Sequence, residues 1–263
     1  MSFAALVQIC LDRIEQAKAN LTYLLGGNDV GKTTLAKELA KQLVLEGEKV
    51  AIIDADPGQS SRLPLTLSLN YTNKQFKDFS ELVLADWDFM PSYNLLECFE
   101  RYIKLVERWT KKAKEEMDCC FVDSNGDVRK SLKLREIEIL KPDLVIALQR
   151  KAELEPILKS LGSRTLRLLV PQEVKHKSSR LRKALRNEKL KLYFNNSGMQ
   201  TIRCEVPSDF NQRIVGLYSQ EKFLGLGIAE DRNADGLRVM TPVGAKVDKV
   251  EFSWIKLKEV LWQ

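Results

Sequence analysis

Residues 26–34 combine glycines, a lysine and two threonines at a spacing that suits the binding of a polyphosphate. The run reads Gly26-Gly27-Asn28-Asp29-Val30-Gly31-Lys32-Thr33-Thr34, the pattern G-x-x-x-x-G-K-T between an apolar run and a helical pattern. Backbone N–H groups of such a loop hold phosphate oxygens at the positive end of the helix that follows. Lys32 then reaches the β- and γ-phosphates, and the Thr33 hydroxyl ligates Mg²⁺. The predicted nucleotide-binding residues are Gly27, Asn28, Asp29, Val30, Gly31, Lys32, Thr33 and Thr34.

Acidic residues follow two further apolar runs, where ligands gather in an open α/β sheet. Asp54 and Asp56 come after residues 49–53, and Asp123 comes after residues 119–122. One of the first two carboxylates would organise the magnesium shell and the other would accept a proton from an attacking hydroxyl, whereas Asp123 would hold magnesium through water. Alternatively, Asp54 and Asp56 are turn-capping residues before a Pro-Gly pair. The predicted metal residues are Thr33, Asp54, Asp56 and Asp123, and the loop 124–126 is predicted to sense the γ-phosphate.

The most basic stretch, residues 175–191, reads as a helix. Arg182 and Arg186 lie four residues apart, so their side chains share one face of that helix. An arginine pair on a mobile helical lid can neutralise charge on a phosphoryl group in transfer, which makes both arginines candidate catalytic residues beside Lys32 and Asp56. The alternative is an ordinary solvated basic face.

Apolar strands and helices alternate along the chain, and they must position these residues. Strands are expected at 21–25, 49–53, 119–122, 143–148 and 165–170, with less orderly strands at 65–69 and 83–87, and helices at 32–45, 95–116, 132–140 and 154–161. This alternation predicts the α/β fold of phosphate-loop NTPases, with a mostly parallel sheet flanked by helices. Short β-like runs after Cys204 predict a small β-rich C-terminal appendage. We expect a domain at 1–204, with its lid at about 174–194, and a second domain at 205–263.

Composition excludes several classes of protein. The 263 residues are 44% hydrophobic and 30% charged, and no apolar run approaches the ~20 residues that span a bilayer. The N-terminus runs into an amphipathic helix without a basic start, so we expect no signal peptide, no membrane partner and a cytoplasmic location. Five cysteines without a C-x-x-C pair and a single histidine give no zinc site, and His176 is expected at the surface. The net charge of +6 favours a polyanionic partner.

Taken in order, these motifs resemble one family, the polynucleotide 5′-hydroxyl kinases that include the messenger-RNA cleavage-factor kinase and the ribosomal-RNA-processing kinase. The matching segments are 26–34, Asp54-Ala55-Asp56-Pro57-Gly58-Gln59, Asp123-Ser124-Asn125-Gly126, and Arg182 with Arg186 followed by Tyr193-Phe194. The resemblance implies transfer of the γ-phosphate of ATP, with Mg²⁺, to the 5′-hydroxyl of RNA or DNA. It implies that Asp56 is the general base, that Arg182 and Arg186 belong to the lid, and that Gln59 positions the hydroxyl or water near the metal and joins the nucleotide-binding residues. It names no protein partner.

Two departures from the family leave other functions open. In the family's T-x-G-W clasp a tryptophan helps to hold the nucleic acid, but here Ser124 replaces the threonine and Asp127 the tryptophan. About 20 residues precede the first expected strand, so we expect no counterpart of the N-terminal β domain of larger members. The alternatives are a GTPase or ATPase switch that regulates a partner, and a binding module without turnover. The guanine-reading N-K-x-D is absent after residues 144–148, where the chain reads Gln149-Arg150-Lys151-Ala152-Glu153, so adenine is expected.

Overall fold

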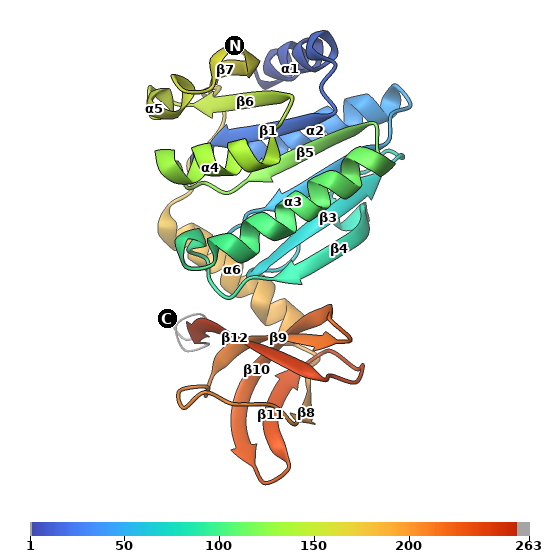
Figure 1. The fold of residues 1–263 in the computed structure, drawn as a ribbon, viewed down its shortest axis with the longest axis vertical. Coiled ribbons are helices and arrows are strands. Elements are labelled where there is room, and N and C mark those ends of the chain that lie inside the picture. Colours follow the sequence, from blue (N-terminus) through green and yellow to red (C-terminus); the bar gives the residue numbers. More distant parts are fainter. Residues whose placement is uncertain (1, 257–263) are drawn as a thin grey trace. The chain divides into compact units, whose positions relative to one another are not determined.

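The computed structural model describes residues 2–256, and its larger sheet has seven strands. Their order is β4 (Val83–Phe89), β3 (Thr66–Thr72), β2 (Val50–Ala55), β5 (Cys119–Ser124), β1 (Leu21–Gly26), β6 (Leu144–Gln149) and β7 (Thr165–Leu169) (Figure 1). Strands β2, β5, β1, β6 and β7 pair in parallel, whereas β3 is antiparallel to β2. The central strands β1, β2 and β6 are buried along their whole length, which explains their continuous apolar runs.

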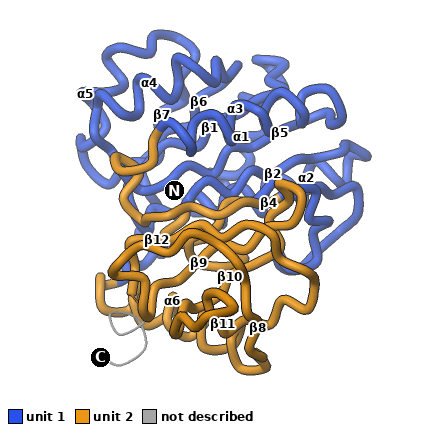
Figure 2. Tube along the Cα trace, turned by 60° about the horizontal axis from the view of Figure 1, so that its bottom comes forward, with its two compact units in different colours: residues 1–56, 68–86, 100–177 blue, residues 57–67, 87–99, 178–263 orange. Residues whose placement is uncertain are grey.

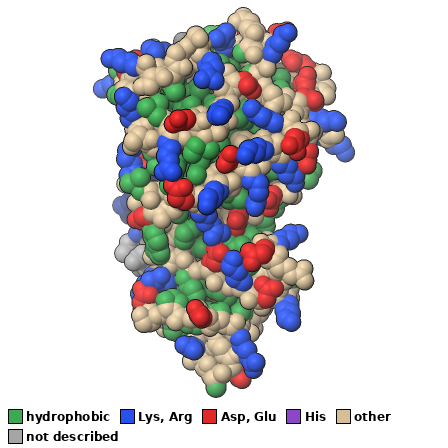
Figure 3. All heavy atoms as spheres, viewed as in Figure 1, with side chains coloured by type: hydrophobic (Ala, Val, Ile, Leu, Met, Phe, Trp, Pro, Cys, Tyr) green, Lys and Arg blue, Asp and Glu red, His purple; other side chains and the backbone are tan. Residues whose placement is uncertain are grey.

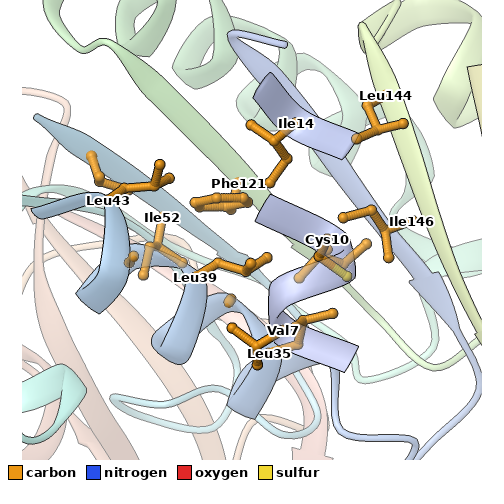
Figure 4. Packing of buried hydrophobic residues seen from close by; sticks show 14 of the residues in the cluster. Val7, Cys10, Ile14, Leu35, Leu39, Leu43, Ile52, Phe121, Leu144 and Ile146 are labelled. Atoms are coloured by element: carbon orange, nitrogen blue, oxygen red, sulfur yellow. The ribbon is translucent and has the colours of Figure 1, made fainter. Parts of the chain in front are cut away.

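Helices cover both faces of this sheet. The helices are α1 (Phe3–Ala17), α2 (Lys32–Leu45), α3 (Phe99–Glu116), α4 (Lys130–Leu140) and the short α5 (Glu155–Leu158). Helices α3 and α4 lie in front of the sheet in Figure 1, and α2 lies behind it. Figure 4 shows side chains of α1 and α2 against strand residues, and the labelled ones are Val7, Cys10, Ile14, Leu35, Leu39, Leu43, Ile52, Phe121, Leu144 and Ile146. This cluster fixes α2, and with it the phosphate loop, on the sheet.

A second sheet follows the basic helix α6 (Ser179–Phe194). Its order is β12 (Lys249–Lys256), β9 (Arg213–Ser219), β10 (Lys222–Asn233), β11 (Gly236–Thr241) and β8 (Gly198–Ile202), with antiparallel pairs throughout. Leu190 and Phe194 of α6 are buried in one cluster with Phe89, Ile214 and residues of β10. The C-terminal half of α6 is therefore part of the core that this sheet builds.

The chain divides into two compact units (Figure 2). Unit 1 contains residues 1–56, 68–86 and 100–177, and unit 2 contains residues 57–67, 87–99 and 178–263. The segments interleave, because two short pieces from the first half of the chain pack with the second sheet. The boundary at residue 204 stays a prediction about domains, and residues 257–263 of the predicted second domain lie outside the described part.

The expected fold class is confirmed: a mostly parallel sheet flanked by helices accompanies an antiparallel β-rich part. The long helix expected at 95–116 is wrong at its start, because it begins at Phe99 after a separate 3₁₀ turn at Leu95–Glu97. Asn94 caps that turn, since its side chain accepts from the Leu96 N–H at 3.3 Å. His176 is exposed, as expected. Within residues 2–256, no helix has the length and apolar character needed to cross a membrane.

Candidate functional site

The phosphate loop lies between β1 and α2, and its glycines are required for two different reasons. An added Cβ at Gly26 would lie 2.7 Å from the Leu148 carbonyl oxygen, so the close approach of β6 excludes a side chain there. Gly31 caps α2 with φ of 93°, a left-handed conformation that disfavours other residues. Glycine at position 31 is therefore a requirement of the backbone conformation.

Lys32 begins α2 and is almost fully buried, at 7% exposure. Its ammonium donates to the carbonyl oxygens of Gly26 at 2.9 Å and Gly27 at 2.8 Å, so it folds back over the loop. Burial lowers the pKa of this ammonium, while the carboxylates of Asp123 and Asp56 act in the opposite direction. A phosphate anion at the loop would favour the charged form in the same way.

The carboxylates gather because of strand register. Asp54 on β2 pairs directly with Asp123 on β5, and both side chains are buried at 2% exposure. Thr33 donates its hydroxyl to Asp123 Oδ2 at 2.5 Å, which connects the first turn of α2 to this pair. β2 ends at Ala55, before Asp56, and the Asp56 N–H donates to Asp54 Oδ1 at 3.4 Å. All four predicted metal residues thus lie in unit 1, with Asp54 and Asp123 side by side.

The surroundings of Asp123 disfavour its ionised form. Burial raises its pKa to about 7, and the neighbouring charges of Asp54 and Asp56 add to this effect, whereas Lys32 and the Thr33 hydroxyl oppose it. Among the described residues no three His, Cys, Asp or Glu side chains are arranged to hold a metal by themselves. A hydroxyl and carboxylates beside a phosphate loop fit Mg²⁺, which keeps several waters and shares its coordination with substrate phosphates.

The segment after β6 braces the phosphate loop. Arg150 Nη2 donates to the carbonyl oxygens of Asp29 at 2.8 Å and Val174 at 3.1 Å. Asp29 in turn has φ of 57° and accepts from the Lys177 N–H at 3.3 Å. Arg150 lies in the segment after β6 that lacks a guanine-reading motif, and it contacts the backbone of the phosphate loop.

The loop after β5 lies against the phosphate loop. A Cβ at Gly126 would lie 2.0 Å from Asn28 Oδ1 and 2.9 Å from the Asn28 backbone nitrogen, so only glycine permits this approach. Ser124 is fully buried and donates to the Leu24 carbonyl oxygen at 2.7 Å, which ties β5 to β1. Between these two residues lies Asn125, a buried polar residue.

Asp127, which replaces the tryptophan of the clasp, forms an ion pair. Arg129 Nε donates to the two carboxylate oxygens of Asp127 at 2.9 and 2.8 Å, and its backbone N–H donates at 3.0 Å. Although burial opposes it, this hydrogen bonding holds the pKa of Asp127 below its ordinary value. The acidic charge at this position is therefore compensated by an adjacent guanidinium.

The remaining predicted residues, Gln59, Arg182 and Arg186, belong to unit 2. Arg186 Nη1 donates to the Gly58 carbonyl oxygen at 3.5 Å, and its guanidinium lies 4.9 Å from the ring centre of Tyr93. One turn later, Lys189 Nζ donates to the Ser60 carbonyl oxygen at 2.5 Å. Two residues of α6 thus contact the segment that follows Asp56, on either side of Gln59.

Sequence reasoning missed a buried charged group on α4. Lys133 and Glu136 have no exposed surface and form a salt bridge at 2.9 Å. The available signal was their spacing, because both lie on the apolar face defined by Leu132, Ile137 and Leu140. Opposite charges three residues apart on an apolar face indicate a buried pair with further polar partners.

A family model described as "mRNA cleavage and polyadenylation factor CLP1 P-loop" matches residues 26–196, which include the phosphate loop, the three aspartates and α6. The chain belongs to this family. Two solved structures share this fold at 12% identity. The wild-type Clp1p–Pcf11p complex has a TM-score of 0.72 over 96% of this chain and 79% of that chain. A structure of Clp1p and Pcf11p that is described as giving the structural basis for ATP loss in a Gly135Arg point mutant has a TM-score of 0.70 over 97% of this chain and 80% of that chain.

Curated relatives of this family member come from archaea. A polyribonucleotide 5′-hydroxyl-kinase of Pyrococcus horikoshii is 37% identical over 73% of this chain and 55% of its own length. One of Methanocaldococcus jannaschii is 37% identical over 79% of this chain and 57% of its own length. The chain therefore spans about half the length of these curated relatives.

Proposed function

We propose that this chain is an ATP-dependent polynucleotide 5′-hydroxyl kinase that acts on RNA or DNA. The observation that carries the proposal is the acidic cluster beside the phosphate loop, where Asp123 accepts from Thr33 and pairs in register with Asp54. Membership of the CLP1 P-loop family and relatives named polyribonucleotide 5′-hydroxyl-kinases support the same chemistry and favour RNA.

In the proposed reaction the 5′-hydroxyl oxygen attacks the γ-phosphorus of ATP. A new oxygen–phosphorus bond forms, the bond from the γ-phosphorus to the β,γ-bridging oxygen breaks, and ADP leaves with the electron pair. The hydroxyl proton passes to the carboxylate of Asp56, which acts as the general base. Lys32 and the loop N–H groups hold the β- and γ-phosphates and stabilise the charge that moves toward ADP.

Magnesium would be held by Thr33 with Asp54 and Asp123, while the phosphates and water supply its other ligands. The ion would supply charge neutralisation between the β- and γ-phosphates. Two oxygen-donor carboxylates in adjacent register beside a hydroxyl support this assignment, and no described soft ligand competes for the ion there.

Arg182 and Arg186 would contact the transferred phosphoryl group, and Gln59 would position the attacking hydroxyl. Their support is the spacing of the arginines on α6 and the contact of Arg186 with the segment that contains Gln59. For the nucleic acid substrate, the ion pair with Arg129 offsets the repulsion that Asp127 would otherwise exert on phosphates. Adenine is favoured because Arg150 and its neighbours replace the guanine-reading motif.

The test is transfer of the labelled γ-phosphate from ATP, and separately from GTP, to short RNA and DNA oligonucleotides. We expect label on oligonucleotides with a 5′-hydroxyl, none on the same oligonucleotides with a 5′-phosphate, and faster transfer from ATP. Release of free phosphate without labelled oligonucleotide would contradict the proposal and favour a nucleotide-hydrolysing switch.

A further inference from the structure

The buried pair Lys133–Glu136 is the centre of a hydrogen-bonded network in unit 1. The Lys133 ammonium donates to Tyr23 Oη at 3.0 Å, Asn125 Oδ1 at 2.8 Å and Glu136 Oε2 at 2.9 Å. An ammonium has three N–H groups, so its donor capacity is filled. Tyr102 Oη donates to the other carboxylate oxygen of Glu136. The network thus joins β1, α3 and α4 to the loop that lies against the phosphate loop.

Stability alone does not account for this network. Removing two charges from water is costly, and well-packed apolar side chains of similar volume are often as stabilising as a buried ion pair. What the charges add is a fixed geometry, because the three N–H groups of Lys133 and both carboxylate oxygens of Glu136 have defined partners. Of the three partners of the Lys133 ammonium, Asn125 lies in a loop, the one after β5, and it is 6% exposed.

The orientation of the Asn125 amide follows from its partners. Its Oδ1 accepts from the Lys133 ammonium at 2.8 Å and from the Asp127 N–H at 3.2 Å. Both partners are donors, so the oxygen and nitrogen ends of the amide are distinguished. Within residues 2–256, the Asn125 Nδ2 has no hydrogen-bond acceptor. The N–H groups of this amide are therefore available to a ligand.

Asn125 lies in the loop that follows β5, at the edge of the sheet where the phosphate loop also lies. Asn125 follows Asp123 by two residues, and Gly126 abuts Asn28 of the phosphate loop. A neutral donor held at this edge can bind an oxygen that a triphosphate has and a diphosphate lacks. A donor that was free to rotate would have to be ordered when the nucleotide binds.

We infer that Asn125 is a γ-phosphate-contacting residue and that Lys133 is the positioning residue that aims its amide. This inference rests on the proposed function, because it requires a nucleoside triphosphate in the phosphate loop. The neutral side chain of Asn125, oriented by the buried charge of Lys133, would then give the preference for triphosphate over diphosphate.

The test is the affinity for magnesium–ADP and for a non-hydrolysable ATP analogue with a β,γ-imido bridge, measured by calorimetry. Asn125→Ala should lose about tenfold of the preference for the analogue, because one hydrogen bond to a charged group is lost, with ADP affinity changed by less than about twofold. Lys133→Met should show the same selective loss. The double variant Asn125→Ala/Lys133→Met should lose no more of this preference than either single variant, because both changes remove the same contact, that of the Asn125 amide with the γ-phosphate.

Lys133→Met leaves Glu136 buried without its cation, so the fold is tested separately. Lys133→Met/Glu136→Gln removes the lone charge and should unfold at a higher temperature than Lys133→Met, yet should keep the selective loss. Lys130→Met, at an exposed position of the same helix, is the matched control and should bind both nucleotides as the wild type does. Additive losses in the double variant, or equal losses for ADP and the analogue, would overturn the inference.

This experiment needs no phosphate acceptor, so its result is independent of the proposed transfer reaction. A wild type that shows the selective pattern but labels no oligonucleotide would refute the kinase and leave the role of Asn125 standing. A wild type that binds ADP and the analogue equally would overturn the role of Asn125, whether or not it labels oligonucleotides.

Discussion

Asp123 meets two requirements that oppose each other. In the proposed site it would share a metal with Thr33 from a buried position beside Asp54, yet burial and the neighbouring acid raise its pKa to about 7. In the metal-free protein the ionised carboxylate is therefore held at a cost that nucleotide-bound magnesium would offset.

This cost predicts how stability depends on pH. The folded pKa of Asp123 is raised above the ordinary value of 3.8, so the folded state binds more protons between these values, and this residue's contribution to stability falls as pH rises from about 4 to about 7. Asp123→Asn removes the charge. In the presence of a chelator it should unfold at a higher temperature than the wild type at pH 8, and the difference should shrink toward pH 4.5. A difference that is independent of pH would show that ionisation of Asp123 is not penalised.

At the scale of single residues, local spacing predicts the motif and strand register supplies the rest. The positions of Lys32 and Thr33 follow from nine consecutive residues. The sequence places Asp54 and Asp123 at strand ends, but their direct pairing depends on the strand order β2-β5-β1, which no local pattern contains. The contact of Lys133 with Asn125 depends on tertiary packing in the same way, so it was not foreseen.

Helix α6 is buried near its C-terminal end and exposed near its N-terminal end. Leu190 and Phe194 belong to the core of unit 2, while Leu181 in the first turn is 46% exposed. Its periodicity predicts the helix, and the structure has it at Ser179–Phe194. The sequence does not predict that the helix packs with the second sheet, because apolar residues at helical spacing do not indicate which element they pack against.

The position of Arg186 on this helix predicts a split between rate and binding. Arg186→Ala should lower kcat for phosphate transfer by about 100-fold, because a donor to the transferring group is lost, and should change ATP affinity by less than about threefold. Arg180→Ala, at an exposed position in the first turn of the same helix, is the matched control and should leave both unchanged. Steady-state kinetics and nucleotide titration make the comparison. If Arg186→Ala turned over like the control, α6 would not be the lid.

At the scale of the whole molecule the chain is basic. The net charge is +6, but Figure 3 shows Lys and Arg side chains mixed with Asp and Glu side chains across the face in view. The overall fold class was predictable because alternating apolar strands and helices extend over most of the chain. The interleaving of units 1 and 2 was not, because residues 57–67 and 87–99 pack with strands more than a hundred residues later.

The proposed binding of RNA by this basic chain predicts that its activity depends on salt. Raising monovalent salt from about 50 to about 200 mM should raise the KM for a ten-nucleotide RNA by roughly tenfold, since about three phosphate contacts release counterions. A dinucleotide acceptor should respond much less, because it offers fewer phosphates. Transfer assays at both lengths and with saturating ATP separate these effects, and equal salt dependence for the two acceptors would place the RNA contacts at its 5′ end alone.

The central claim is that Lys32 holds the nucleotide while Asp56 activates the 5′-hydroxyl. The most direct measurement compares ATP affinity and transfer to 5′-hydroxyl RNA in Lys32→Ala and Asp56→Ala. We predict that both variants lose transfer, that Lys32→Ala also loses ATP affinity, and that Asp56→Ala largely keeps it, because only the base is removed. Loss of ATP affinity in Asp56→Ala equal to that in Lys32→Ala, or transfer at the wild-type rate in Asp56→Ala, would contradict this division of roles.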